Sequence, residues 1–403
     1  PGTTGTKNNF IGGLSGDAIT EGSQNVAIGT ETLSSDTLGS RSVAIGQGAL
    51  YAQNFTSATN AFNTAVGYEA GVSITTGTVN TLIGGDAGKS LAVGDNNVAV
   101  GYAALKTEDG NGYNVAVGTE ALETLNAGAN AYNVAVGYQA GHDVTTGKYS
   151  TYIGGQTGQN ITTGTYNTAV GQAALNDDTT GQRTTAIGYG ALSTQNFTGG
   201  QISYNTAVGY VAGTALTTGQ SNSLVGYATG DALTTGFANT VVGSAALSAE
   251  DTGRYNTAIG AGALENQNND VDNYNTAVGY NAGNAVTTGI NNTLIGGLAG
   301  DVLTDADDNV AIGYAALSAD AKGDGSVAVG KFALANQNFT SVTSTHNTAI
   351  GYSAGAAITT GGVNTIVGSL AANALTTGVY NVSMGVNGLG YGTSGNFFYF
   401  FFV

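Results

Sequence analysis

The 403-residue chain has no cysteine and only one proline, Pro1, although it contains 66 glycines. The absence of cysteine excludes disulfide bonds, thiolate metal sites and thiol nucleophiles, so burial and backbone pairing must stabilise the fold. The scarcity of proline and the lack of a glycine at every third position exclude a collagen helix.

Charge is also scarce, because Asp, Glu, Lys and Arg make up only 9% of the chain, with a net charge of −17. This composition does not fit a charged disordered tail. Nine scattered basic residues form no phosphate-binding surface, so we expect no nucleic-acid partner. The sequence has no long apolar run, and we therefore expect no membrane span.

What the chain has in abundance is one 17-residue repeat, of which residues 63–79, NTAVGYEAGVSITTGTV, are a representative copy. We number its positions from place one, Asn63, to place seventeen, and call the circuit made by one copy a coil. The glycine at place five recurs in twenty-two copies, and examples are Gly67, Gly84, Gly101 and Gly118.

The spacing of the copies predicts the domain organisation. Copies begin 17 residues apart, except that every fourth step is 19 or 21 residues, which gives a 142-residue super-repeat relating Asn63, Asn205 and Asn347. We therefore predict one continuous repeat domain over residues 1–385, beginning in the middle of a copy, and a divergent segment over residues 386–403.

Each copy predicts a short strand, a turn and a return segment. Places two to four alternate β-branched and small residues, as a strand does, and we predict a second strand at places six to nine. Glycine at place five lets the backbone turn where a side chain would clash, and glycine at place fifteen, such as Gly77, is expected to supply a positive φ. Seventeen residues leave no room for a helix. The sequence thus predicts an all-β parallel β-solenoid, or β-roll, of about 22 coils and on the order of 100 Å long.

Compensating substitutions support this alignment. Two copies in each group of four pair a small residue at place nine with an aliphatic at place twelve, as in Gly71 and Ile74. Another copy reverses the pattern, as in Leu105 and Glu108, so one large aliphatic is expected to fill the core from either side. Place three is usually alanine, but every fourth copy has a bulky residue that marks a socket in the core or in a contact between chains: Phe10, Leu82, Tyr152, Leu224, Leu294 and Ile366.

Acidic residues recur at place twelve once in four coils, about 19 Å apart, which is too far for a catalytic carboxylate pair. They are weak candidates for calcium ligands, with Asp109, Asp177 or Asp251 nearby; the favoured interpretation is a solvated turn. No other cofactor is expected. These five acids are Asp36, Glu108, Asp178, Glu250 and Asp320.

The longer returns carry an Asn-Phe-Thr triplet that matches an N-glycosylation acceptor. Each triplet is interpreted either as an exposed loop whose phenylalanine packs on the rod or as a loop that carries a glycan or contacts a ligand. The acceptor residues would be Asn54, Asn196 and Asn338.

Aromatic and histidine residues give weaker signals. Tyrosine often follows the place-five glycine and predicts a ladder of stacked rings in preference to a sugar-binding strip: Tyr68, Tyr138, Tyr210, Tyr280 and Tyr352. The two histidines, His142 and His346, are far apart and lack a repeated carboxylate partner. The sequence therefore predicts neither a Ser-His-Asp arrangement nor a zinc site.

The C-terminal segment ends in an aromatic run that is too short to span a bilayer as a helix. It is expected either to cap the last coil of its own chain or to add a strand to a neighbouring subunit. The aromatic residues that would make this contact are Phe397, Phe398, Tyr399, Phe400, Phe401 and Phe402.

The pentads at residues 25–29, NVAIG, and 42–46, SVAIG, resemble the head repeats of trimeric autotransporter adhesins, and the resemblance extends over residues 8–385. It implies a left-handed parallel β-roll in which three chains assemble outside the bacterial cell for attachment. Related repeats occur in phage tail fibres. Single chains stacked end to end into a longer filament are the alternative assembly.

These observations lead to a functional hypothesis. We expect a non-enzymatic structural protein of an extracellular fibre or surface adhesin, which associates with identical chains and presents repeated loops to glycans or a host-surface ligand. A phage tail-fibre segment that binds a host receptor is the alternative. A polysaccharide-acting β-solenoid enzyme is the contrasting class, and it predicts a cleft with close acidic residues in one or two coils only.

Overall fold

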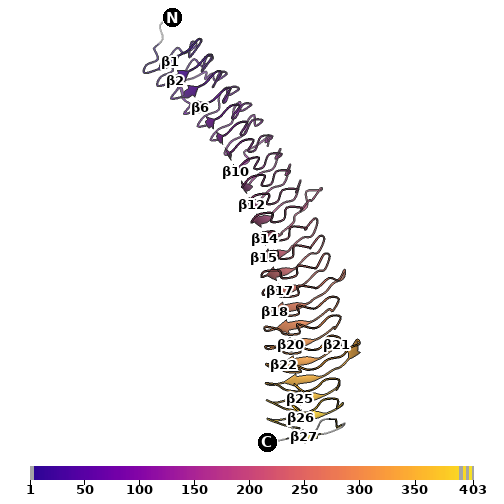
Figure 1. Ribbon diagram of the computed structural model, residues 1–403. Helices are drawn as coiled ribbons and strands as arrows, with labels where there is room; N and C mark the ends of the chain where they lie inside the picture. The colour runs from indigo at the N-terminus through magenta and orange to yellow at the C-terminus, as the bar shows by residue number, and fades with distance from the viewer. Residues whose placement is uncertain (1–3, 390–393, 396–398, 402–403) are drawn as a thin grey trace. The chain divides into compact units, whose positions relative to one another are not determined.

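The computed structural model describes residues 4–389, 394–395 and 399–401, which form an all-β parallel solenoid of about 22 coils without a helix. The chain divides into two compact units, Pro1–Tyr204 and Asn205–Val403, each of which is a stack of coils (Figure 1). The fold class predicted from the sequence is confirmed. In the described part of the chain, no helix has the length and apolar character needed to cross a membrane.

In the first unit, three-residue strands pair in parallel, and residues at the same place of successive copies are register partners, as Thr64 and Thr81 are. Two shorter strands in the long returns, β3 (Gly39–Ser40) and β5 (Thr59–Asn60), form a separate parallel pair. The strands of the main sheet are β1 (Asn9–Ile11), β2 (Val26–Ile28), β4 (Val43–Ile45), β6 (Thr64–Val66), β7 (Thr81–Ile83), β8 (Val98–Val100), β9 (Val115–Val117), β10 (Val134–Val136), β11 (Thr151–Ile153), β12 (Thr168–Val170) and β13 (Thr185–Ile187).

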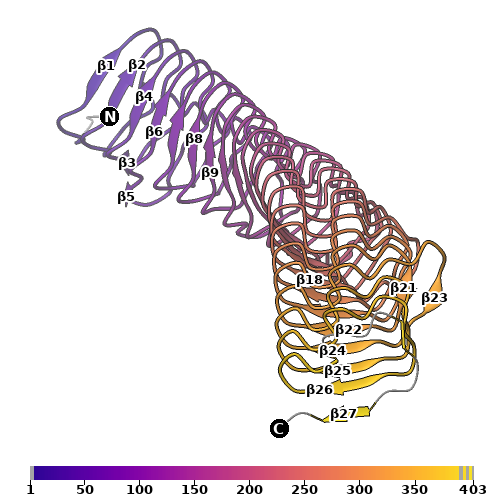
Figure 2. The same ribbon diagram turned by 60° about the horizontal axis from the view of Figure 1, so that its bottom comes forward.

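The second unit repeats this arrangement, and a second view shows its strands one beside the next (Figure 2). The returns contribute a separate pair, β21 (Gly323–Asp324) and β23 (Thr343–Ser344). The main strands are β14 (Thr206–Val208), β15 (Ser223–Val225), β16 (Thr240–Val242), β17 (Thr257–Ile259), β18 (Thr276–Val278), β19 (Thr293–Ile295), β20 (Val310–Ile312), β22 (Val327–Val329), β24 (Thr348–Ile350), β25 (Thr365–Val367), β26 (Val382–Met384) and β27 (Tyr399–Phe401).

The glycine at place five ends each strand because of a close approach between coils. Gly84 has φ of 136°, and a β-carbon on it would lie 2.3 Å from the carbonyl oxygen of Gly101 in the next coil. A β-carbon on Gly67 would likewise lie 2.3 Å from the carbonyl oxygen of Gly84. Only glycine satisfies both the backbone conformation and the space, so the recurrence of this residue has a steric cause.

The second strand predicted at places six to nine is absent, and that prediction is wrong. Places seven and nine have positive φ, as shown by Glu69 (51°) and Gly71 (59°), and left-handed residues cannot continue an extended strand. The segment still pairs between coils. The Glu69 N–H donates to Gln47 O in the preceding coil, and the Gly71 N–H donates to Ala87 O in the following coil, both at 2.9 Å.

The positive φ expected at place fifteen is also wrong. Gly77 does not have a positive φ, and the left-handed residue is Val79 at place seventeen, with φ of 61°. Gly77 is required for a different reason, because a β-carbon on it would lie 2.4 Å from Gly94 O. Its own carbonyl oxygen accepts a hydrogen bond from Asn63 Nδ2 at 2.7 Å, so glycine here brings two coils and a buried amide together.

Aliphatic side chains fill the core of each unit from two sides, as the compensating pattern predicts. Ile74 and Leu91 at place twelve are fully buried, and so are Leu33 and Leu105 at place nine. Burying one such side chain stabilises the fold by about 1.5–3 kcal/mol, so each coil depends on one of these residues.

The bulky residues at place three occupy sockets in the core. Leu82 lies between two glycines at place nine, and β-carbons on Gly71 and Gly88 would approach its methyl groups to 2.6 and 2.8 Å. Tyr152 fits between Gly141 and Gly158 in the same way. Leu224, Leu294 and Ile366 are also fully buried, whereas Phe10 in the first described strand is 36% exposed.

Buried asparagines at place one form a hydrogen-bonded column through the coils. Asn80 Oδ1 accepts the main-chain N–H of Asn97 at 2.9 Å, and its own N–H donates to Asn63 Oδ1 at 3.0 Å. Its Nδ2 donates to the carbonyl oxygen of Gly94 at 2.8 Å. The amide therefore joins three coils and satisfies backbone groups that would otherwise be buried without partners.

Candidate functional site

The five acids at place twelve are fully buried, so the favoured interpretation of a solvated turn is wrong. Asp178 shows the reason. Its Oδ1 accepts the N–H groups of Gly181 and Phe197 at 3.0 and 3.1 Å, and its Oδ2 accepts from Gln195 Nε2 at 2.7 Å. The acid thus anchors its own return segment and the longer return of the next coil.

This arrangement also bears on the calcium interpretation. Asp36 and Asp320 receive the same three kinds of donor as Asp178, from a main-chain N–H three residues later, a return N–H and a glutamine amide. A cation would have to displace these donors. None of the five acids belongs to a described group of three or more residues whose potential ligand atoms lie close together.

Burial raises the pKa of Glu108, Asp178 and Glu250 above their ordinary values, while hydrogen bonds from nearby amides oppose the shift. The folded chain therefore holds these protons more tightly than the unfolded chain does. As a consequence, these groups lower stability as the pH rises from the ordinary carboxyl range through the raised pKa values, and the loss is complete above them.

Glu108 differs from the other four acids in one contact. The next coil has Leu125 at place twelve, where the other four acids meet a glutamine, and Glu108 Oε2 is buried without a hydrogen-bond partner. We expect Glu108→Gln to raise the free energy of unfolding at pH 7 by about 1 kcal/mol, because a neutral amide costs less to bury than a carboxylate and its oxygen can still accept from Asn111. Chemical denaturation at pH 7 measures this change.

Glu250→Gln is the matched control. Glu250 Oε2 accepts from Gln267 Nε2 and Asn273 Nδ2, both at 2.9 Å, and an amide nitrogen at that position would face two donors. This variant should lose stability at pH 7. Equal effects of the two substitutions would contradict the assignment of Glu108 as the unpaired acid.

Two of the three Asn-Phe-Thr loops bury their phenylalanine: Phe55 and Phe197 are 5% and 1% exposed, whereas Phe339 is only partly buried. Asn54 and Asn338 are exposed, and Asn196 is partly exposed. Thr37 Oγ1 donates to Asn54 Oδ1 at 3.1 Å, and Thr179 does the same for Asn196 at 3.0 Å. Asn54 and Asn196 therefore lie at the surface of loops that a buried phenylalanine holds against the coils.

Most of the tyrosine ladder predicted at place six is absent. The next coil has Gly85, Gly155, Gly297 and Ser369 at that place, so the prediction is wrong for Tyr68, Tyr138, Tyr280 and Tyr352. In the second unit, Tyr210 and Tyr227 do stack, with ring centroids 5.6 Å apart.

A longer ladder is formed in the first unit by the last residue of successive copies. Tyr113, Tyr132, Tyr149 and Tyr166 stack with centroids 5.1, 5.7 and 5.1 Å apart, and about half of each side chain is exposed. Arg183 lies 5.9 Å above the Tyr166 ring. We call these four tyrosines the tyrosine column. Because their faces cover one another, the column presents ring edges and hydroxyl groups to solvent.

Unlike His346, His142 lies against carboxylates. Its Nε2 is 3.0 Å from Glu123 Oε2, and its Nδ1 is 2.6 Å from Asp143 Oδ1. Glu120 lies in the same coil as Glu123. One ligand atom from each of Glu120, Glu123 and His142 lies within 4.8 Å of the other two. The sequence-based expectation missed this cluster because it required a partner that repeats along the chain.

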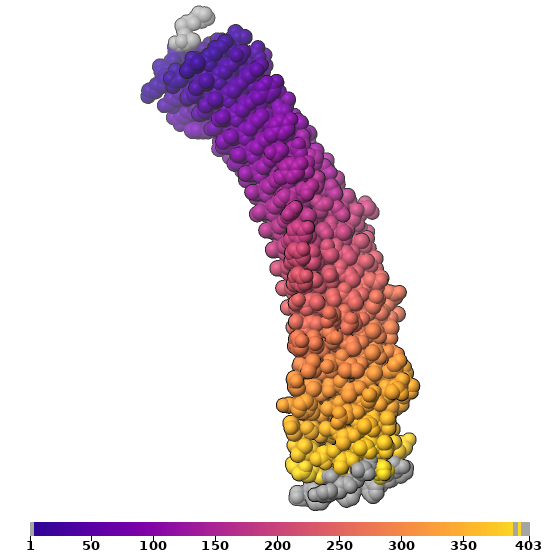
Figure 3. Space-filling view, in the orientation of Figure 1, coloured from indigo at the N-terminus to yellow at the C-terminus, as the bar shows by residue number. Residues whose placement is uncertain are grey.

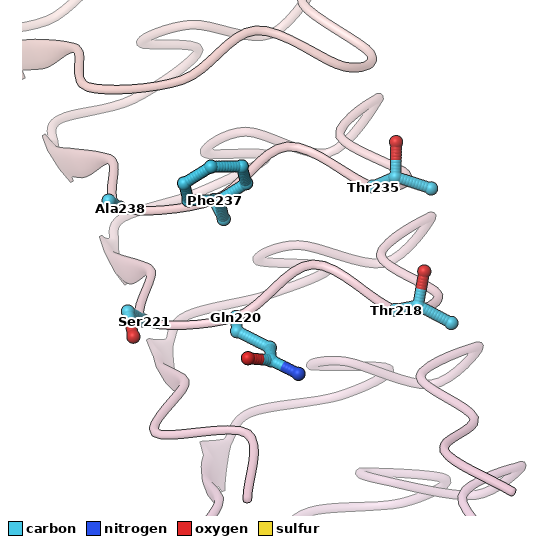
Figure 4. Close-up of a pocket in the computed structure, with 6 residues that line it drawn as sticks. All are labelled: Thr218, Gln220, Ser221, Thr235, Phe237 and Ala238. Atoms are coloured by element: carbon cyan, nitrogen blue, oxygen red, sulfur yellow. The ribbon is translucent and has the colours of Figure 1, made fainter. Parts of the chain in front are cut away.

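A pocket of about 250 Å³ opens on the second unit where two coils have small residues at place seventeen, Ser221 and Ala238 (Figure 4). Phe237, Gln220, Thr218 and Thr235 complete its lining. None of these side chains titrates near neutral pH, so the pocket offers apolar contact and hydrogen bonds without an acid or a base.

We compared the chain with family models, curated proteins and solved structures, and none of them matched. The site must therefore be interpreted from the columns of the solenoid alone. Figure 3 shows side chains of successive coils covering one face of each unit in close contact.

The 17-residue step continues past the last place-five glycine. In the C-terminal segment, β27 pairs in parallel with β26, and Tyr399, Phe400 and Phe401 are the partners of Val382, Ser383 and Met384. This strand lies one repeat length beyond β26 on the same chain. The predictions for Phe397, Phe398 and Phe402 fall outside the described residues.

The sequence contains the information that places both the histidine cluster and the tyrosine column. Residues at the same place in adjacent copies lie side by side, even across a 19-residue step. Glu123 and His142 both occupy place ten, and Tyr132 and Tyr149 are each the last residue of their copy. Aligning all seventeen places, in addition to the apolar ones, would have shown both features.

Proposed function

We propose that this chain is a non-enzymatic structural protein of an extracellular fibre or surface adhesin. One observation carries the proposal: in both units the coils are held together by the same interior groups, place after place. The fold therefore produces a repeated exterior, on which loops such as those with Asn54 and Asn196 in the first unit recur at a fixed interval of the sequence. The resemblance to adhesin head repeats agrees with this role, and a phage tail-fibre segment shares the same architecture.

The enzyme hypothesis has less support. A polysaccharide-acting enzyme needs a cleft with two carboxylates about 5–9.5 Å apart. Glu120 and Glu123 do occur in a single coil, but their nearest ligand atoms lie within 4.8 Å of each other and of His142. Lys106 and His142 already contact Glu123, so its carboxylate is not free to act in a catalytic pair.

The proposed fibre associates with identical chains, and we place a contact between copies on the tyrosine column. Its ring edges form a continuous exposed apolar strip in the first unit, and such strips mark interaction surfaces. Three chains are proposed from the resemblance, and end-to-end filaments are the alternative.

Sedimentation equilibrium of the purified chain tests this proposal. We expect a mass three times the 39.8 kDa of one chain. The double variant Tyr132→Ser, Tyr149→Ser should shift the chain toward the monomer, because it interrupts the apolar strip. Tyr138→Ser, which removes a half-exposed ring at place six, is the matched control and should leave the mass unchanged.

The other outcomes are also decisive. A ladder of masses that grows with concentration would indicate end-to-end filaments. A monomer at all concentrations would contradict a self-assembling fibre. Repeating the measurement on material from the native source after deglycosylation reports whether Asn54, Asn196 and Asn338 carry glycans.

A further inference from the structure

The cluster of Glu120, Glu123 and His142 is assembled by the stacking of two coils in the first unit. Glu120 and Glu123 occupy places seven and ten of the coil that starts at Asn114, and His142 occupies place ten of the next coil. The side chains of Glu123 and His142 are 19% and 23% exposed, so the cluster lies at the surface but is partly shielded from water.

The two ring nitrogens of His142 both face carboxylate oxygens. Nδ1 lies 2.6 Å from Asp143 Oδ1, and we assign the proton of the neutral ring to Nδ1 because this is the shorter of the two contacts. In the neutral ring Nε2 then has a lone pair, which points at the carboxylate of Glu123 from 3.0 Å. Only a positive charge at Nε2, either a second proton or a metal ion, makes this contact attractive.

The neighbouring side chains engage one oxygen of each glutamate. Glu123 Oε1 is paired with Lys106 Nζ at 3.0 Å, and Glu120 Oε2 accepts from Gln139 Nε2 at 2.8 Å. Each glutamate therefore keeps its other oxygen for the cluster. Zinc ligands at about 2.0–2.1 Å from the metal lie about 3.3 Å apart. The Nε2 of His142 and the Oε2 of Glu123 are 3.0 Å apart, and all three ligand atoms lie within 4.8 Å of one another, so side-chain rotation is enough to bring them to this spacing.

We propose that Glu120, Glu123 and His142 bind one divalent transition-metal ion of the zinc type. An imidazole nitrogen with two carboxylate oxygens is a zinc donor set, and calcium prefers oxygen ligands alone. Asp143 is a positioning residue that holds the ring in the tautomer with Nε2 free, as carboxylates do behind metal-binding histidines. Water completes the coordination. The ion joins the coils that start at Asn114 and Asn133, and it stabilises the folded chain by mass action.

Isothermal titration calorimetry with zinc chloride tests the proposal on the full chain, prepared without a histidine tag and stripped with a chelator. We expect one zinc ion per chain, and His142→Ala should weaken binding at least about tenfold. His346→Ala is the matched control, because it removes the only other histidine, which is exposed, and it should leave binding unchanged. Excess calcium should not displace the zinc.

A second readout separates binding at this site from other effects. Cobalt(II) bound to the wild type should show the visible absorption of a site with nitrogen and oxygen ligands, and His142→Ala should lose it. Asp143→Asn should weaken binding while the melting temperature of the metal-free chain stays the same. If His142→Ala does not fold, Glu120→Gln replaces it, with the same loss of affinity expected. Absence of zinc binding by the wild type, or equal binding by the His142 and His346 variants, would overturn the proposal.

Discussion

Gly84→Ala should destabilise the first unit more than any surface substitution. The new β-carbon would lie 2.3 Å from Gly101 O, and the backbone at φ 136° is in a region that L-residues rarely adopt. Strain of this kind costs on the order of 1–3 kcal/mol before the overlap is counted, so we expect a total loss of at least about 3 kcal/mol. Thermal unfolding followed by circular dichroism, and hydrogen exchange at β6, β7 and β8, measure it.

The adjacent residue supplies the control. Gly85 has no positive φ, and a β-carbon there would meet only Tyr102 Cδ2 at 3.6 Å, an ordinary contact. Gly85→Ala should therefore change stability by less than about 0.5 kcal/mol. Because each coil contacts only its neighbours, the loss of protection in Gly84→Ala should centre on three coils and fade along the stack. Equal effects of the two substitutions would show that glycine at place five has no steric role.

Much of the fold could be predicted because seventeen residues repeat with little change. The alternation in Thr64–Val66 predicts a strand with its middle residue inside, and Ala65 is fully buried in β6. Some copies have their large aliphatic residue at place twelve, as in Ile74, and others have it at place nine, as in Leu105. This alternation predicts that both places face one shared core, and both residues are fully buried. These inferences rest on side-chain volume and periodicity, which a single sequence displays directly.

The errors share a different physical cause. Positive φ at Glu69 and Val79 cannot be read from residue type, because stacking forces ordinary residues into a conformation that they rarely choose. The acids at place twelve were assigned to solvent because an unpaired buried carboxylate is costly. Their donors, such as Gln195 for Asp178, come from the next coil. Partners supplied by stacking were recognised for apolar residues and overlooked for polar ones.

The second large effect is expected from Asn80→Asp, which changes one atom in the buried asparagine column. Asn80 Nδ2 donates to Gly94 O at 2.8 Å, and an aspartate oxygen there would face that carbonyl without a proton between them. Asn80 Oδ1 also accepts from Asn97 N–H, so the amide orientation is fixed by both ends. A buried charge beside an unpaired carbonyl should cost about 3–5 kcal/mol, measured by chemical denaturation at pH 7.

Asn96→Asp is matched in volume and charge, and it distinguishes burial from the added charge. Asn96 is exposed, and its φ of 59° suits aspartate as well as asparagine, so stability should change little. The penalty in Asn80→Asp should shrink at acidic pH, because a protonated carboxyl can again donate to Gly94 O. In that variant, the buried carboxyl has a pKa above the unfolded value, and stability falls as the pH rises through it. If Asn80→Asp loses the same stability at pH 4 as at pH 7, protonation of the new carboxyl does not restore the hydrogen bond to Gly94 O. The column would then depend on packing and not on this hydrogen bond.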